Sequence, residues 1–258
     1  MTPGDAEDAR LAGEISELAG EVLLSVRRAL AGAEPRRRGD EGDRRAHELI
    51  CRLLAGTRPG DAVLSEEGAD DPSRLDAARV WIVDPLDGTR EFGEPDRDDW
   101  AVHVALWADG RLAVGAVALP AQGLTLTSDP APTVPPVASG GPPRIVVSRS
   151  RPPTFVKPLA EALGAELVTM GSAGAKAMAV VRGLADAYVH AGGMYEWDSA
   201  APVAVALAAG LHVSRVDGSP PVYNRPDPFL PDLLVCRPEL AGAILDVIGR
   251  HPSAGPAP

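Results

Sequence analysis

Residues 80–89 read Val80-Trp81-Ile82-Val83-Asp84-Pro85-Leu86-Asp87-Gly88-Thr89 and determine which fold is expected. Its apolar first half predicts a buried strand that ends at Asp84. Pro85 fixes φ and turns the chain out of the sheet, and Gly88 permits a tight turn after it. The carboxylates of Asp84 and Asp87 are therefore expected to face one small cavity, with Thr89 at its edge.

Two carboxylates held this close repel each other, and hard cations such as Mg²⁺ prefer oxygen ligands. The pair thus favours a divalent metal site over unaided acid–base chemistry. Two acids at this spacing can also serve only to close a turn, so the choice between a metal site and a turn depends on the rest of the chain. Further acids stand at expected strand or helix ends, in Glu66-Glu67 and at Asp198.

Composition narrows the class of protein. The 258 residues suffice for one large domain or two closely fused ones. With 25 Lys+Arg against 36 Asp+Glu, the net charge of −11 argues against a binder of nucleic-acid polymers. A polyanionic substrate would therefore need bound cations beside it. The start of the chain does not resemble a signal peptide, and no apolar run has membrane length, so we expect a cytoplasmic protein without a membrane segment.

Hydrophobic periodicity predicts a helix within residues 9–33 and a second around 46–53. Between them, residues 34–43 are charged, and we interpret Arg36–Arg38 as part of a solvated loop. Strands are expected at 62–64, 80–83, 101–107, 112–119, 145–147, 166–170 and 187–189, with an Asp109-Gly110 turn joining the second pair. Helices are expected at 154–163, 174–182 and 199–209. A connecting loop at 131–140 would separate an N-terminal α+β half, residues 1–130, from a C-terminal α/β half, residues 141–258.

Three segments in this order resemble the signatures of the inositol monophosphatase superfamily. They are Val63-Leu64-Ser65-Glu66-Glu67, residues 81–89, and Glu196-Trp197-Asp198-Ser199-Ala200-Ala201. The stretches 87–92 and Ser148-Arg149-Ser150 are most similar to the bacterial 3′(2′),5′-bisphosphate nucleotidases of the CysQ type, in their actinobacterial form. The resemblance covers nearly the whole chain and implies a layered α+β, α/β fold, the αβαβα sandwich of the inositol monophosphatase and fructose-1,6-bisphosphatase type.

The resemblance also implies roles for individual residues. The metal ligands would be Glu66, Asp84, the Leu86 carbonyl, Asp87 and Asp198, holding two or three Mg²⁺ ions, with inhibition by Li⁺. Glu66 and Thr89 would orient a metal-activated water for in-line attack on phosphorus, and Asp43 would hydrogen-bond to Thr89. The substrate would meet Glu66, Leu86, Asp87, Gly88, Thr89, Arg149, Lys176 and Asp198. Arg149 would hold a second phosphate, and Pro202 suggests that the helix carrying Asp198 begins at or just after that residue.

The reaction implied is removal of the 3′-phosphate from 3′-phosphoadenosine 5′-phosphate to give AMP, with the 5′-phosphosulfate as a second substrate. An inositol-1-monophosphatase or a fructose-1,6-bisphosphatase is the alternative within the same chemistry. A third hypothesis is a catalytically silent regulatory protein that keeps the fold. The expected partner is a small phosphorylated nucleotide, and relatives of this kind favour a homodimer.

Overall fold

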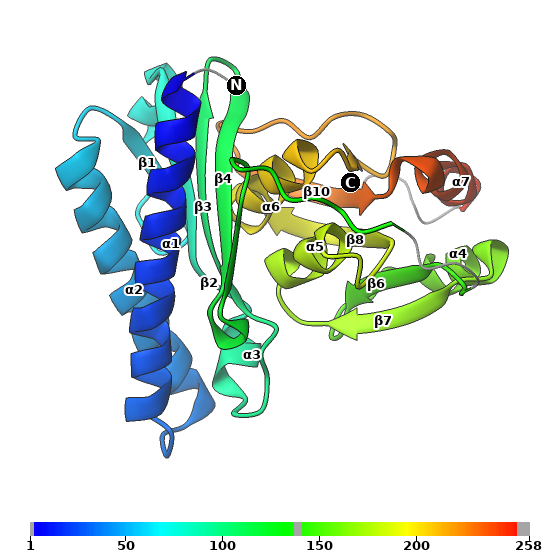
Figure 1. Ribbon diagram of the computed structural model, residues 1–258, viewed down its shortest axis with the longest axis horizontal. Coiled ribbons are helices and arrows are strands. Elements are labelled where there is room, and N and C mark those ends of the chain that lie inside the picture. The colour runs from blue at the N-terminus through cyan, green and yellow to red at the C-terminus, as the bar shows by residue number, and fades with distance from the viewer. Residues whose placement is uncertain (1–2, 137–140, 252–258) are drawn as a thin grey trace.

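The computed structural model describes residues 3–136 and 141–251. Two long helices, α1 (Pro3–Ala29) and α2 (Pro35–Thr57), form an antiparallel pair against one face of the first sheet (Figure 1). Apolar residues of both helices, among them Leu23 and Ile50, share a core with the sheet residues Trp81 and Val104. Within the described residues, no helix combines the length and the apolar character needed to cross a membrane.

The first sheet has five strands in the order of the chain, with β1 parallel to β2 and the other pairs antiparallel. They are β1 (Ala62–Ser65), β2 (Arg79–Asp87), β3 (Ala101–Ala108), β4 (Arg111–Leu119) and β5 (Leu124–Thr127). The predicted turn between β3 and β4 is present, and its residues Asp109 and Gly110 both have positive φ, 51° and 77°. A short helix, α3 (Thr89–Gly93), follows β2 directly.

The second sheet has the order β7-β6-β8-β10-β9. Its strands are β6 (Arg144–Ser148), β7 (Glu166–Met170), β8 (Ala187–Tyr195), β9 (His212–Ser214) and β10 (Phe229–Cys236). Strand β6 runs parallel to β7 and β8, whereas β10 is antiparallel to β8 and β9. The predicted loop at 131–140 falls between the two sheets; residues 137–140 lie outside the described residues, and the division of the chain into two halves stays a prediction.

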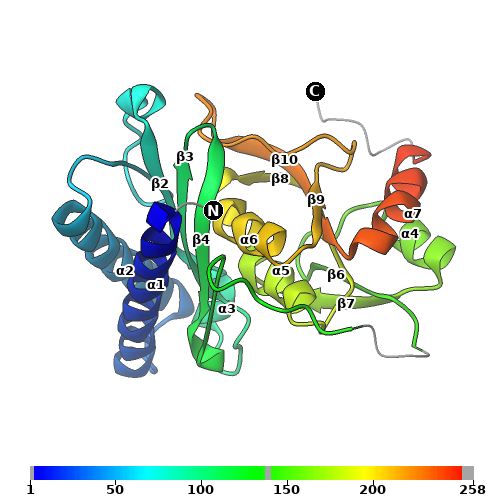
Figure 2. The same cartoon turned by 45° about the horizontal axis from the view of Figure 1, so that its top comes forward.

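Helices fill the space between the sheets and cover the outer face of the second. Helices α5 (Ala173–Val181) and α6 (Glu196–Ala208) lie between the sheets, and α4 (Val156–Leu163) and α7 (Pro238–Gly249) lie outside (Figures 1 and 2). Three apolar cores hold the five layers together, and the middle core, which includes Met178 and Val205, packs α5 and α6 against both sheets. The predicted αβαβα sandwich is confirmed.

The segment between the first two helices differs from the prediction. Residues 35–43 belong to α2, which starts with a proline at its first position, where a missing N–H costs no helical bond. Arg38 is only 3% exposed and donates to the carbonyls of Leu30, Ala31, Ala33 and Gly93. Carbonyls that follow the end of a helix need donors, and Arg38 supplies them. Its interpretation as part of a solvated loop was wrong.

Candidate active site

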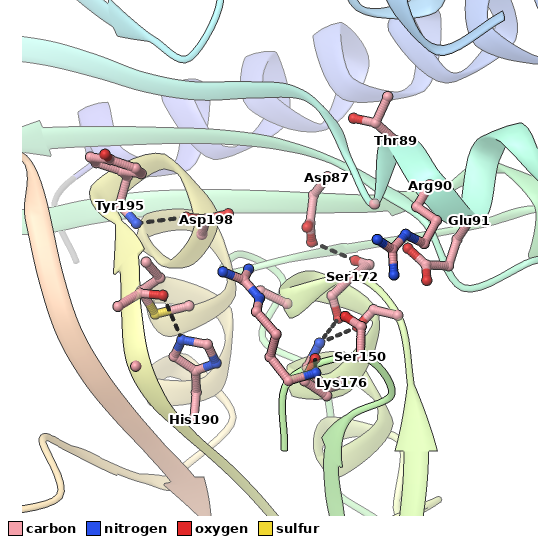
Figure 3. A pocket seen from close by; sticks show the side chains of 18 of the residues that line it. Asp87, Thr89, Arg90, Glu91, Ser150, Ser172, Lys176, His190, Tyr195 and Asp198 are labelled. Carbon is pink, nitrogen blue, oxygen red and sulfur yellow. Dashed lines mark hydrogen bonds between the residues drawn. The ribbon is translucent and has the colours of Figure 1, made fainter. Parts of the chain in front are cut away.

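A cavity of about 700 Å³ opens where the two sheets and the ends of α3, α5 and α6 meet. Figure 3 shows Asp87 and Thr89 reaching it from the first sheet and α3, with Ser172 and Lys176 opposite them on α5 and Asp198 on α6. These side chains are far apart in the sequence and converge because each stands at the end of a strand or the start of a helix.

The turn after β2 is shaped by a break in the pairing of β2 with β3. Register is regular up to Asp84 and resumes at Asp87, so Pro85 and Leu86 form a bulge. A proline is tolerated at such a point because it has no ladder hydrogen bond to lose. Gly88 then adopts φ of 90°, and Thr89 begins α3. Asp87 thus lines the cavity, whereas Asp84 is buried and is not among the described residues of the lining. The predicted strand end at Asp84 is wrong, because β2 continues through the bulge to Asp87.

Three carboxylates form an acidic cluster: Asp84, Asp87 and Asp198 each offer an oxygen within 4.8 Å of the others. Asp84 Oδ1 accepts from the Leu86 N–H at 3.0 Å, while its buried Oδ2 meets no hydrogen-bond donor in the described part of the chain. Asp198 Oδ2 accepts from the Tyr195 N–H at 2.6 Å. A buried carboxylate that has one oxygen without a donor and two other carboxylates close by is the arrangement that a hard cation satisfies.

The electrostatics of the cluster support the same conclusion. Burial and the neighbouring charges of Glu66, Asp87 and Asp198 hold the pKa of Asp84 well above its ordinary value. Burial and Asp87 likewise raise the pKa of Asp198. A bound divalent cation would relieve this repulsion. The three clustered carboxylates therefore fit a divalent cation, and the parts that Glu66 and the Leu86 carbonyl would play in holding it stay predictions.

Asp87 differs from the other two acids of the cluster, because positive partners lower its pKa. Burial alone would raise its pKa, but His103 and other donors outweigh burial and lower it. Asp87 Oδ2 accepts from the Ser172 hydroxyl and from the Gly174 N–H at 2.7 Å, and lies 3.2 Å from His103 Nε2. His103 is fully buried on β3, and its Nδ1 lies 3.1 Å from the Trp197 carbonyl. The ring therefore lies between Asp87 and the start of α6. This placement could not be predicted from the sequence, in which His103 is only a polar residue on an expected strand.

Thr89 and Asp43 are brought together as expected. The Thr89 hydroxyl lies 3.4 Å from Asp43 Oδ2 and 3.3 Å from the Leu86 carbonyl. Asp43 projects from α2, and burial followed by the charges of Glu67 and Glu66 raises its pKa to about 8. Glu66 follows β1 at the exposed rim of the cavity.

The two cations predicted to meet the substrate are placed differently. Lys176 lines the cavity; its Nζ donates to the carbonyls of Gly171 and Ser172, and burial lowers its pKa to about 8. Arg149 instead forms ion pairs of 2.6 and 2.8 Å with Glu91 and Glu94.

Two other arginines, Arg90 and Arg151, line the cavity, and neither was predicted from the sequence to contact the substrate. Arg149 is not among the described residues that line this cavity. Its role as a phosphate clamp stays a prediction.

The start of α6 corrects a second expectation. The helix begins at Glu196, two residues before Asp198, so Pro202 lies in its interior and not in its first turn. Without an N–H, Pro202 cannot donate to the Asp198 carbonyl four residues earlier. The earlier start places Asp198 at the third helical position, where its side chain accepts from the Tyr195 N–H and helps to cap the helix.

Comparison with known proteins decides the family. Residues 11–132 and 138–249 match the sequence model of the inositol monophosphatase family. The chain belongs to the inositol monophosphatase family. This confirms the superfamily predicted from the sequence, and the family is metal-dependent, in agreement with the acidic cluster.

Individual members of the family are similar over most of this chain. A Mycobacterium leprae protein named 3′-phosphoadenosine 5′-phosphate phosphatase is 53% identical over 252 residues, 93% of each chain. The Escherichia coli K12 3′(2′),5′-bisphosphate nucleotidase CysQ is 33% identical over 197 residues, 72% of this chain and 79% of that protein. The crystal structure of CysQ from Bacteroides thetaiotaomicron superposes with a TM-score of 0.77 at 28% identity, over 90% of this chain and 97% of that one. Because these relatives are phosphatases and nucleotidases by name, the prediction of an enzyme that hydrolyses phosphoric monoesters is confirmed.

Proposed function

We propose that this chain is a Mg²⁺-dependent phosphatase that removes the 3′-phosphate of 3′-phosphoadenosine 5′-phosphate, giving AMP and phosphate. The 5′-phosphosulfate, which carries the same 3′-phosphate, is the second substrate. The observation that carries the proposal is the acidic cluster with the unpartnered, buried Oδ2 of Asp84, in a chain 53% identical to a phosphatase of that name.

The cluster would hold two or three cations. Asp84, Asp87, Asp198 and Glu66 supply carboxylate oxygens and Leu86 a carbonyl. When bound, the cations supply neutralisation of the phosphate charge and activation of water. The protein's own part is to hold the ligands in place, which it does through the N–H of Leu86 on Asp84 and the donors around Asp87.

Thr89 and Gly88 act beside the cluster. Asp43 and the Leu86 carbonyl fix the position of the Thr89 hydroxyl, which faces the cavity together with Glu66 and would orient the attacking water with it. The backbone N–H groups of Gly88 and Thr89 lie before the first helical hydrogen bond of α3 and would donate to phosphate oxygens.

A bisphosphate carries a second phosphate that has to be bound without being cleaved. Among the described residues, Lys176, Arg90 and Arg151 line the cavity and are in position to meet it. For Arg149 to act as the clamp, its guanidinium would have to leave Glu91 and Glu94. We therefore assign the second phosphate to Lys176 and Arg151, with Arg90 and Arg149 as the competing assignments.

The test is phosphate release in Mg²⁺ from 3′-phosphoadenosine 5′-phosphate, inositol 1-phosphate and fructose 1,6-bisphosphate, repeated with Li⁺. We expect the highest kcat/KM on the nucleotide and inhibition by Li⁺. A higher kcat/KM on inositol phosphate or fructose bisphosphate would overturn the substrate assignment. No release from any of the three would support the silent binding protein instead.

A further inference from the structure

Aromatic side chains are scarce in this protein, at 4% of the sequence, and most of them are buried. Trp81, Trp100 and Phe92 are 0% exposed. Tyr195 and Phe229 are each 45% exposed, and within the described residues no other aromatic side chain reaches that level. Both line the cavity that holds the acidic cluster. Exposed ring surface is unfavourable in water, so its concentration beside the reaction site points to a ligand.

These two rings belong to an ordered group that we call the aromatic rim, made of Tyr195, Trp197 and Phe229. Tyr195 stacks on Trp197 with ring centroids 4.8 Å apart and planes 12° from parallel. Phe229 meets Tyr195 edge to face, 6.1 Å between centroids and 82° between planes. Stacked and edge-to-face pairs are the favourable arrangements of aromatic rings. The rim is therefore held in place before any ligand binds, and Figure 3 shows its member Tyr195 beside Asp198.

The backbone places the rim through an irregularity in the second sheet. Pairing of β8 with β10 shifts between Ala191 and Met194, where Gly192 and Gly193 adopt φ of 101° and 92°. The Phe229 ring packs directly on Gly193: a Cβ at that position would lie 2.6 Å from the ring. Glycines at such positions allow another group to approach the backbone closely. This bulge seats Phe229 against β8 at the edge of the cavity.

We infer that the aromatic rim binds the nucleobase of the substrate by stacking, an inference that rests on the proposed function. The acidic cluster would bind the reacting phosphate, and Lys176 and Arg151 would bind the second phosphate. The part of a nucleotide that remains is a planar, largely apolar base, for which an aromatic face is the general binding surface. A cavity of about 700 Å³ is large enough for a whole nucleotide.

The experiment compares 3′-phosphoadenosine 5′-phosphate with 1-deoxyribose 3,5-bisphosphate, which keeps the sugar and both phosphates but has no base. Phe229→Ala should lower kcat/KM for the nucleotide about tenfold, mainly through KM, because stacking on one ring is lost. Its kcat/KM for the abasic compound should stay within about twofold of wild type. Phe229→Tyr keeps an aromatic ring, so its kcat/KM for the nucleotide should be close to that of wild type. Leu184→Ala is the matched control, because Leu184 is an apolar side chain 50% exposed that is not among the described residues lining the cavity.

The outcomes separate the inference from the function on which it rests. Wild-type protein that cleaves the abasic compound as efficiently as the nucleotide would overturn base stacking while leaving the phosphatase in place. An equal loss on both substrates in Phe229→Ala, or no loss, would also overturn it. If that equal loss came with a change in oligomeric state on size-exclusion chromatography, the rim would be an interface with a second copy instead. Wild-type protein that cleaves neither compound would refute the proposed function, and the inference with it.

Discussion

Asp84→Asn should stabilise the metal-free protein while abolishing its activity. The substitution keeps the shape of the side chain and the bond from the Leu86 N–H, because an amide oxygen accepts as a carboxylate oxygen does. The other atom becomes an uncharged NH₂ group, so residue 84 no longer brings a negative charge within 4.8 Å of the carboxylates of Asp87 and Asp198. A repulsion between carboxylates is thereby removed.

The size of the effect follows from Coulomb's law. Two like charges at 4.8 Å repel by about 3 kcal/mol at an effective dielectric constant of about 20. Partial protonation and the nearby His103 relieve part of this, so we expect a net gain of roughly 1–2 kcal/mol. In a chain of this size such a gain raises Tm by roughly 3–6 °C.

The assay is thermal unfolding in EDTA and again in Mg²⁺, together with phosphate release. Wild type should gain stability from Mg²⁺, and Asp84→Asn should be more stable than wild type in EDTA and gain less from the metal. Asp232→Asn is the matched control: Asp232 is buried but bound to Arg215 at 2.7 and 2.8 Å, so losing its charge should lower Tm. A lower Tm for Asp84→Asn in EDTA, or an undiminished response to Mg²⁺, would refute the reasoning.

Two further predictions concern the positioning of the site and the second phosphate. Gly39→Ala would place a Cβ 2.5 Å from Thr89 Cγ2 and displace Thr89 by about 1 Å, so kcat should fall tenfold or more. Gly56→Ala on the same helix is the control and should keep full activity, because no atom of the described residues lies within 4 Å of its new Cβ. A Gly39→Ala enzyme with wild-type kcat would contradict the role of Thr89. Arg151→Ala should raise KM for the bisphosphate about tenfold and for adenosine 3′-phosphate much less, because the lost contact is to the second phosphate. If Arg149→Ala shows this selective loss and Arg151→Ala does not, the original assignment of the clamp to Arg149 is the right one.

The features of the fold that could be predicted from the sequence are those that depend on neighbouring residues. The apolar strand that leads into Asp84, the glycine turn at Gly88 and the hairpin at Asp109-Gly110 each follow from neighbouring residues. The predicted end of that strand was wrong, because β2 continues through a bulge at Pro85 and Leu86 to Asp87. Order and spacing of three acidic motifs then identified the family, and with it the partners of the metal site. The strands β5, β9 and β10 and the helix α7 were not predicted, since their patterns are short or lie in stretches that carry no such motif.

What the sequence could not predict depends on partners that are distant in the chain. A basic run at Arg36–Arg38 looks solvated until the fold brings the carbonyls after α1 to Arg38. Arg149 looks like a free cation after a strand until α3 brings Glu91 beside it. Pro202 was assigned to a first turn from its residue type alone, although α6 begins at Glu196 and is capped by Asp198 from its third position. For the two arginines, a long-range contact outweighed a local preference.

The most direct test of the metal centre is phosphate release from 3′-phosphoadenosine 5′-phosphate by protein stripped of metal, followed as Mg²⁺ is added back. We predict no release in EDTA, recovery to full activity with Mg²⁺, and AMP with its phosphate at the 5′ position as the nucleotide product. Release that is unchanged by metal removal, or adenosine 3′-phosphate as the product, would contradict the assignment of the cluster of Asp84, Asp87 and Asp198 to metal-dependent cleavage of the 3′-phosphate.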